Sequence, residues 1–115
     1  MKSFTVVALA MLIAFGLKAG DLGGVWKGSM DTQGGLVEMT FLLQPGPGLA
    51  GVVKSTQFGE APIRKAKVEG DRISFEINIT YGTVAFEGTA TGDDMNLRVT
   101  GTQGDKYNLN CRRQK

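Results

Sequence analysis

Histidine is absent from this 115-residue chain, and cysteine occurs once, as Cys111. Without histidine the chain lacks the commonest general base and the commonest metal ligand. A single cysteine excludes an intramolecular disulfide, so stability must come from packing. No serine is spaced with a base that would activate it, and the acids stand in turns. We therefore expect no enzymatic activity, no metal site and no cofactor.

Long apolar runs are also scarce, with one exception at the N-terminus. An uncharged run from Phe4 to Leu17 follows Lys2 and ends before Lys18. This pattern predicts a signal peptide over residues 1–19, cleaved after Ala19, because a membrane-spanning helix needs about 20 apolar residues. An uncleaved anchor is the alternative. No cysteine near the cleavage site offers a lipid attachment point, so we expect a secreted or periplasmic protein without a stable membrane span.

Clustered positive charge is the third absence. The whole chain carries 13 basic and 11 acidic residues, and removal of residues 1–19 takes away two lysines and no acid. The mature chain is then electrically neutral, and its basic residues alternate with acids. Nucleic-acid binding depends on clustered positive charge, so we expect no nucleic acid among its partners.

Alternation of apolar and polar residues, punctuated by Gly, Asp and Pro, dominates the chain from Gly20 onward. A period of two is typical of strands with one buried face. In residues 72–80, for example, Ile73, Phe75 and Ile77 share one face. The pattern predicts a single all-β domain over residues 20–115 with about eight antiparallel strands, beginning near residues 25, 36, 49, 63, 72, 84, 95 and 107.

Short turn signals connect these predicted strands. Gly70-Asp71 and Gly92-Asp93 suit tight hairpin turns, and Pro45-Gly46-Pro47-Gly48 suits another sharp reversal. Consecutive strands joined by short loops favour an antiparallel meander. Eight such strands can close into a small barrel, closed or partly open, and a two-sheet β-sandwich is the alternative.

Alternate loops of a meander lie at opposite ends, so the loops at the two ends can be compared. One end carries the three minimal turns. The other end carries longer loops, and neutral amides beside aromatic rings suit a polar, uncharged ligand such as a saccharide or a peptide backbone. Solvated linkers of no function are the alternative. The candidate ligand-binding residues are Gln33, Gln57, Phe58, Tyr81 and Gln103.

The segment Gly24-Val25-Trp26-Lys27-Gly28 resembles the Gly-x-Trp motif of lipocalins. In that family the tryptophan plugs one end of the barrel under a basic residue from the last strand. The resemblance implies a structural role for Trp26, with Arg112 or Arg113 as the cation over the indole.

A broader similarity, to a small bacterial all-β module found ahead of the catalytic domain in some α/β-hydrolases and also alone, spans the mature chain. It implies a non-catalytic envelope module, and we expect no hydrolase domain to follow it here. The matching features are Gly24-x-Trp26-x-Gly28, Ser55-x-Gln57 with Pro62-Ile63, Gly70-Asp71-x-Ile73-x-Phe75, Phe86-Glu87-Gly88, Gly101-Thr102-Gln103-Gly104, and Leu109 before Arg112.

Three functions remain open at this stage. The first is an exported, non-catalytic binding module whose partner is a small molecule, a saccharide or an envelope protein. The second is a lipocalin-like carrier of a small apolar ligand, and the third is an accessory to a hydrolase encoded elsewhere. The large apolar side chains should nearly fill the interior, although glycines at inward positions could leave a small pocket: Gly28, Gly51, Gly88 and Gly101.

Overall fold

A computed structural model describes residues 22–45 and 49–114 of the protein. The predicted signal peptide and residues 46–48 of the predicted Pro-Gly turn lie outside the described residues. Within the described part, no helix is long and apolar enough to cross a membrane.

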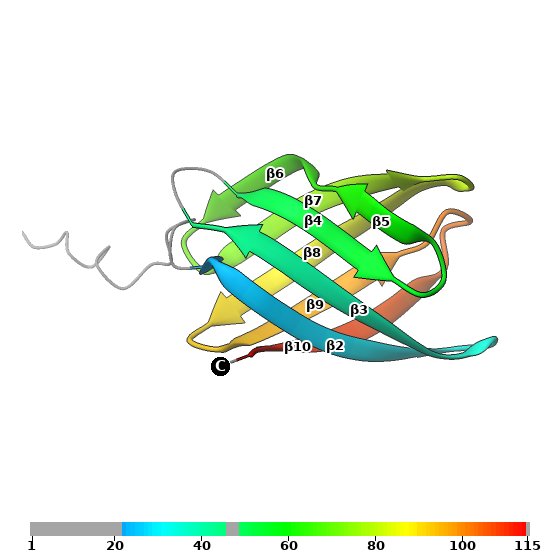
Figure 1. Ribbon diagram of the computed structural model, residues 1–115, viewed down its shortest axis with the longest axis horizontal. Helices are drawn as coiled ribbons and strands as arrows, with labels where there is room; N and C mark the ends of the chain where they lie inside the picture. The colour runs from blue at the N-terminus through cyan, green and yellow to red at the C-terminus, as the bar shows by residue number, and fades with distance from the viewer. Residues whose placement is uncertain (1–21, 46–48, 115) are drawn as a thin grey trace, which may run out of the picture.

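Nine antiparallel strands make up this part of the chain, all in one sheet (Figure 1). The sheet order is β5-β4-β3-β2-β10-β9-β8-β7-β6, so the last strand pairs with the first and the sheet curls into a nearly closed barrel. The all-β meander is therefore confirmed, and the structure is a barrel instead of a sandwich. The strands are β2 (Gly24–Thr32), β3 (Gly35–Gln44), β4 (Ala50–Ser55), β5 (Gly59–Pro62), β6 (Arg64–Glu69), β7 (Arg72–Ile79), β8 (Gly82–Thr91), β9 (Asp94–Thr100) and β10 (Lys106–Arg113).

The seam of the barrel lies between β5 and β6. The sequence pattern predicted only one strand here, beginning near residue 63, and no separate strand for β5. β5 pairs with β4, and β6 pairs with β7. Between them the backbone is irregular, because Lys65 has a positive φ of 53° and the β6–β7 register shifts between Arg64 and Lys67. The two strands thus resemble halves of one bent strand, the first paired on one side of the seam and the second on the other.

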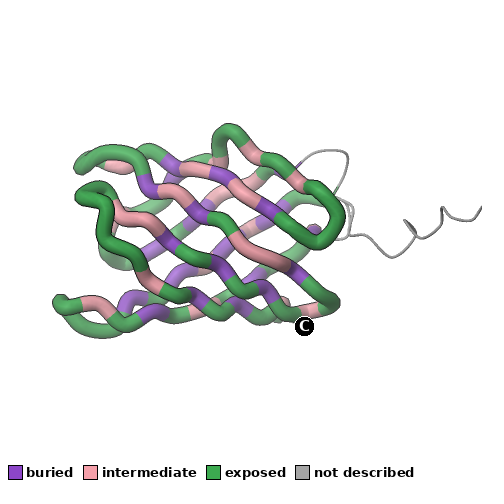
Figure 2. The backbone as a smooth tube through the Cα atoms, turned by 180° about the vertical axis from the view of Figure 1, so that it is seen from behind, coloured by how far each residue is buried: buried purple, intermediate pink, exposed green. Residues whose placement is uncertain are grey.

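Buried and exposed residues alternate along the strands, as Figure 2 shows. The predicted inward faces are confirmed: Ile73, Phe75 and Ile77 on β7 are all 3 % exposed or less. Three phenylalanines fill the middle of the barrel. The rings of Phe75 and Phe86 stack with their centroids 4.8 Å apart, and Phe41 meets both edge-on at 6.0 and 5.7 Å. Such contacts close the barrel's central section to any larger ligand.

The inward glycines do not leave the pocket that the sequence suggested. A Cβ atom at Gly88 would overlap the carbonyl oxygen of Asn96 on the paired strand, and Gly28 and Gly51 meet neighbouring backbone in the same way. At Gly101 a Cβ would come 2.8 Å from a carboxylate oxygen of Asp105. These glycines therefore serve the close approach of bent strands, because the space beside them is already occupied.

Candidate functional site

One end of the barrel is closed by Trp26, whose side chain is fully buried. Its indole Nε1–H donates a hydrogen bond of 2.9 Å to the carbonyl oxygen of Leu22, another fully buried residue. The guanidinium carbon of Arg113 lies 4.4 Å from the centroid of the indole ring, a cation–π distance. Arg113, and not Arg112, is therefore the cation over Trp26. Arg112 is exposed and pairs with Asp94 at 3.5 Å.

Arg113 also ties three parts of the closed end together. Its Nε donates to Oδ1 of Asp93 at 2.8 Å, and its Nη2 donates to the carbonyl oxygen of Gly92 at 3.1 Å. Its Nη1 donates to the carbonyl oxygen of Gly23. One side chain from the last strand thus links the β8–β9 turn to the segment that enters the first strand.

The two tight turns at this end present little side-chain surface. Gly70-Asp71 joins β6 to β7, and Gly92-Asp93 joins β8 to β9. Both glycines adopt the left-handed conformation, with φ of 64° and 61°. This conformation favours glycine, which explains why each turn opens with one. With Trp26 buried beneath them, these short turns leave the closed end with few side chains that could contact a ligand.

The opposite end carries all five residues predicted to bind a ligand. The loops that hold them are all at the same end of the barrel, at the right of Figure 1, away from the C-terminus. The three amides are exposed, Tyr81 is 80 % exposed, and Phe58 is half-buried with its ring packed against the core. We call this ring of four loops the open rim: residues 33–34, 56–58, 80–81 and 101–105.

The strand order places the four loops around the barrel, not in one cluster. The β2–β3 turn is separated from the β7–β8 turn by β10 and β9, and the β4–β5 loop lies across from the β9–β10 loop. Gln33, Tyr81, Phe58 and Gln103 therefore lie on different sides of this end of the barrel. A ligand that contacts all of them would have to lie across the end of the barrel.

Side-chain bonds hold individual rim loops in shape. Thr32 Oγ1 donates to the carbonyl oxygen of Gly35 at 2.8 Å and accepts from the amide of Gly34 at 3.1 Å. In the β4–β5 loop the backbone N–H of Gln57 donates a hydrogen bond to Ser55 Oγ at 3.0 Å. Because such local bonds fix the backbone, the rim is partly organised before any ligand arrives.

Sequence reasoning missed an acid–phenol pair at the rim. The hydroxyl of Tyr107 donates to a carboxylate oxygen of Asp105. This hydrogen bond lowers the pKa of Asp105 and raises the pKa of Tyr107, because it stabilises the carboxylate and the protonated phenol. Sequence reasoning also missed Leu36 as an exposed apolar side chain next to the rim, with 62 % of its surface exposed. Its position just after an Asp-Thr-Gln-Gly turn was the sequence signal that could have indicated this exposure.

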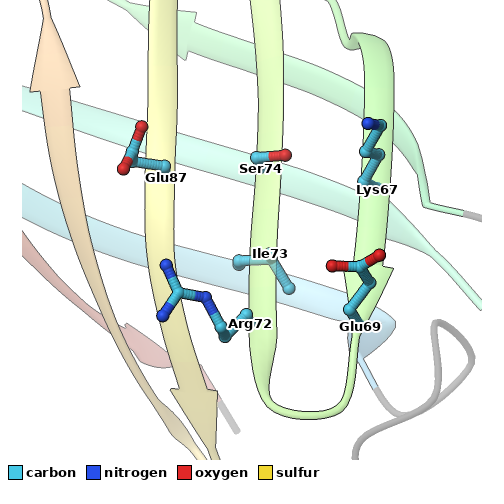
Figure 3. Close-up of a pocket in the computed structure, with 6 residues that line it drawn as sticks. All are labelled: Lys67, Glu69, Arg72, Ile73, Ser74 and Glu87. Atoms are coloured by element: carbon cyan, nitrogen blue, oxygen red, sulfur yellow. The ribbon is translucent and has the colours of Figure 1, made fainter.

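Away from the rim, the outer face of the sheet bears shallow depressions. Figure 3 shows one across β6, β7 and β8, lined by Lys67, Glu69, Arg72, Ser74 and Glu87, with Ile73 beneath. Its cations and carboxylates alternate, so it presents no charge of one sign. Alternating charges of this kind are typical of a solvated sheet surface.

The single thiol of the chain lies in the barrel core. Cys111 is 1 % exposed, and burial raises the pKa of its thiol to about 12. A neutral, buried thiol is a poor nucleophile. Among residues 22–45 and 49–114, no group of three or more Cys, Asp or Glu side chains could hold a metal ion.

The fold and the two unequal ends define a small, nearly closed antiparallel β-barrel. No protein-family model and no curated protein matches the sequence. Among solved structures the chain is similar to a designed protein described as a de novo fluorescence-activating β-barrel. The TM-score is 0.56 at 22 % identity, and the match covers 84 % of this chain and 96 % of the designed one. This similarity supports the barrel fold; it does not extend to the hydrolase-associated module.

Proposed function

We propose that the protein is an exported, non-catalytic binding module of the bacterial cell envelope that engages its ligand at the open rim. The contrast between the two ends carries this proposal. The closed end is sealed by Trp26 and Arg113 and by two minimal turns. The open rim instead presents loops with exposed amides and aromatic rings, and binding residues concentrate on such loops above a rigid scaffold.

The side chains of the rim favour a polar, uncharged ligand. An amide both donates and accepts hydrogen bonds, so Gln33, Gln57 and Gln103 can satisfy the hydroxyls of a saccharide or a peptide backbone. Phe58 and Tyr81 can cover the apolar face of a sugar ring or a peptide side chain. These five side chains carry no formal charge, so they give no electrostatic reason to prefer a charged ligand at the rim.

A specific observation also favours the carrier function as a second candidate. Phe58, Ile79 and Tyr107 are only half-buried, although all three pack against the core at the open end. A small apolar ligand could cover the exposed surface of these three side chains at the open end. The stacked phenylalanines below would confine it to that outer layer, and the similarity to a fluorescence-activating barrel fits this mode.

The test compares rim variants with variants elsewhere on the barrel. Residues 20–115 would be screened on arrays of neutral oligosaccharides and uncharged peptides, and Kd would be measured for each hit by calorimetry. We expect Phe58→Ala and Tyr81→Ala each to weaken binding at least about tenfold, as for aromatic anchors at interfaces. Arg72→Ala, in the depression of Figure 3, should change nothing.

Two outcomes would contradict the proposal. Unchanged affinity in both rim variants, with a loss in Arg72→Ala, would move the site to the outer face. A co-purified apolar ligand in native mass spectrometry, released by Phe58→Ala, would favour the carrier function instead.

A further inference from the structure

An apolar row crosses the outer face of the barrel near its closed end. The strand register places Val25 opposite Leu42, Leu42 opposite Val52, and Val52 opposite Pro62, so four outward side chains lie side by side on β2 to β5. Val25 is 37 % exposed. Outward positions of an antiparallel sheet are ordinarily polar, so a continuous apolar row needs an explanation.

Three residues of the row, the exposed Val25 and the half-buried Leu42 and Val52, line a groove with a volume of about 660 Å³. At one end of the groove the chain at Gly23 packs closely on Pro45, because a Cβ atom at Gly23 would lie 2.9 Å from the Cβ of Pro45. Apart from Gln44, every lining residue is apolar or glycine: Gly23, Gly24, Val25, Leu42, Leu43, Pro45, Gly51 and Val52.

A band of charged side chains runs beside the apolar row, two residues away on each strand. The register continues it from Asp94 through Arg112, Lys27, Thr40 and Lys54 to Glu60, so the band holds three cations and two carboxylates. Arg112 and Lys54 have carboxylate partners at 3.5 and 3.7 Å, but these pairs are exposed and contribute little. Lys27 has no ion pair within the described part of the chain.

The groove also lies where the N-terminal apolar run joins the barrel. That run ends at Leu17, and only residues 18–21 separate it from the described chain at Leu22. Four residues span at most about 14 Å. Whenever the run sits in a bilayer, as a signal peptide or as an anchor, the groove is therefore held close to the lipid surface.

We propose that this groove docks the barrel onto the surface of an anionic lipid bilayer. The apolar row enters the boundary between headgroups and acyl chains, and Lys27, with the paired cations on either side of it, contacts the anionic headgroups. The same two elements, apolar area and adjacent positive charge, drive interfacial binding of peripheral proteins. Docking at this end leaves the open rim facing away from the membrane.

The experiment measures co-sedimentation of residues 20–115 with lipid vesicles. This segment contains all nine described strands and every residue of the described core. We expect binding to vesicles of phosphatidylglycerol and phosphatidylethanolamine, and binding at least about tenfold weaker to pure phosphatidylcholine. Raising the salt concentration should weaken the first, because it screens the charged headgroups.

Matched variants separate the groove from general surface effects. The double change Leu42→Ser with Val52→Ser should reduce partitioning at least about tenfold, whereas Leu36→Ser, on β3 next to the open rim, should not. Lys27→Glu should reduce partitioning, and Lys106→Glu, at the start of β10 next to the rim, should leave it nearly unchanged. Thermal melts of each variant would verify that the barrel is folded, and Val52→Ser alone would replace the double change if it unfolds.

Several results would overturn the proposal. Equal binding to both vesicle types, or no binding to either, would exclude anionic lipid as the occupant of the groove. A dimer in sedimentation velocity without vesicles, lost in the Leu42→Ser and Val52→Ser chain, would show that a second copy covers the groove instead.

Discussion

At the scale of single residues, Arg113 holds the closed end more than any other charged side chain described. It stacks on Trp26 and donates hydrogen bonds to Asp93 and to the carbonyls of Gly92 and Gly23. A planar guanidinium can stack on an indole and donate in several directions at once, which an ammonium group cannot. The Gly-x-Trp resemblance pointed to a cation here. It could not select Arg113, because the choice depends on which face of β10 turns inward.

Cys111 gives a pH dependence that can be measured. Its pKa is raised from 9.0 to about 12 in the folded barrel, because burial disfavours the thiolate. The unfolded chain therefore releases this proton first as the pH rises above 9. We expect the free energy of unfolding to fall between pH 9 and 12 by up to about 1.4 kcal/mol per pH unit from this group alone.

The control for this prediction is Cys111→Ala. Urea denaturation of both chains at pH 8 to 11 isolates the contribution of the thiol, because all other ionisable groups are the same in the two chains. Parallel pH curves for the two chains would show that Cys111 is not protected in the folded state.

At the scale of elements, the close approaches made by glycine shape the strands. Gly88 on β8 is paired with Leu97 and lies against the backbone of Asn96. We expect Gly88→Ala to cost about 3 kcal/mol of stability, since the new Cβ would displace β9. Gly34→Ala should be nearly neutral, because its Cβ would meet only Thr32 Oγ1 at 3.8 Å. Urea titration measures both, and similar midpoints would contradict this account of the strand bend.

Strands with one buried face could be predicted from the sequence, because inward residues such as Ile73 and Phe75 repeat at a period of two. The same rule failed where both faces carry apolar residues. In Phe41-Leu42-Leu43 and in Val52-Val53 the alternation disappears, so the outward apolar row could not be seen. Continuous apolar runs of this kind predict a strand that is buried on both faces.

The seam was missed for a different physical reason. β5 is four residues long and ends in Pro62, so it resembles a loop in the sequence. The bend after it depends on a positive φ at Lys65, which no residue preference foretells. The rim residues were placed correctly by strand parity all the same, because β5 and β6 together act as one bent strand. The hydrogen bond between Tyr107 and Asp105 needed the fold of the β9–β10 loop.

At the scale of the whole molecule, the two ends of the barrel differ in structure. Trp26 and Arg113 seal one end, stacked phenylalanines fill the middle, and the open rim presents loops of mixed amides and aromatic rings. The apolar groove lies near the sealed end, on the outer face. A module docked by its groove would hold the rim toward the surroundings, so the two proposals assign different work to opposite ends.

The most direct test of the binding end is a chemical-shift titration of ¹⁵N-labelled residues 20–115 with a set of neutral oligosaccharides and uncharged peptides. We expect the backbone amide signals of residues 33–34, 56–58, 80–81 and 101–105 to shift together when a ligand is added, and those of the turns at 70–71 and 92–93 to stay in place. Movement confined to the turns or to the outer sheet, with a silent rim, would contradict this expectation.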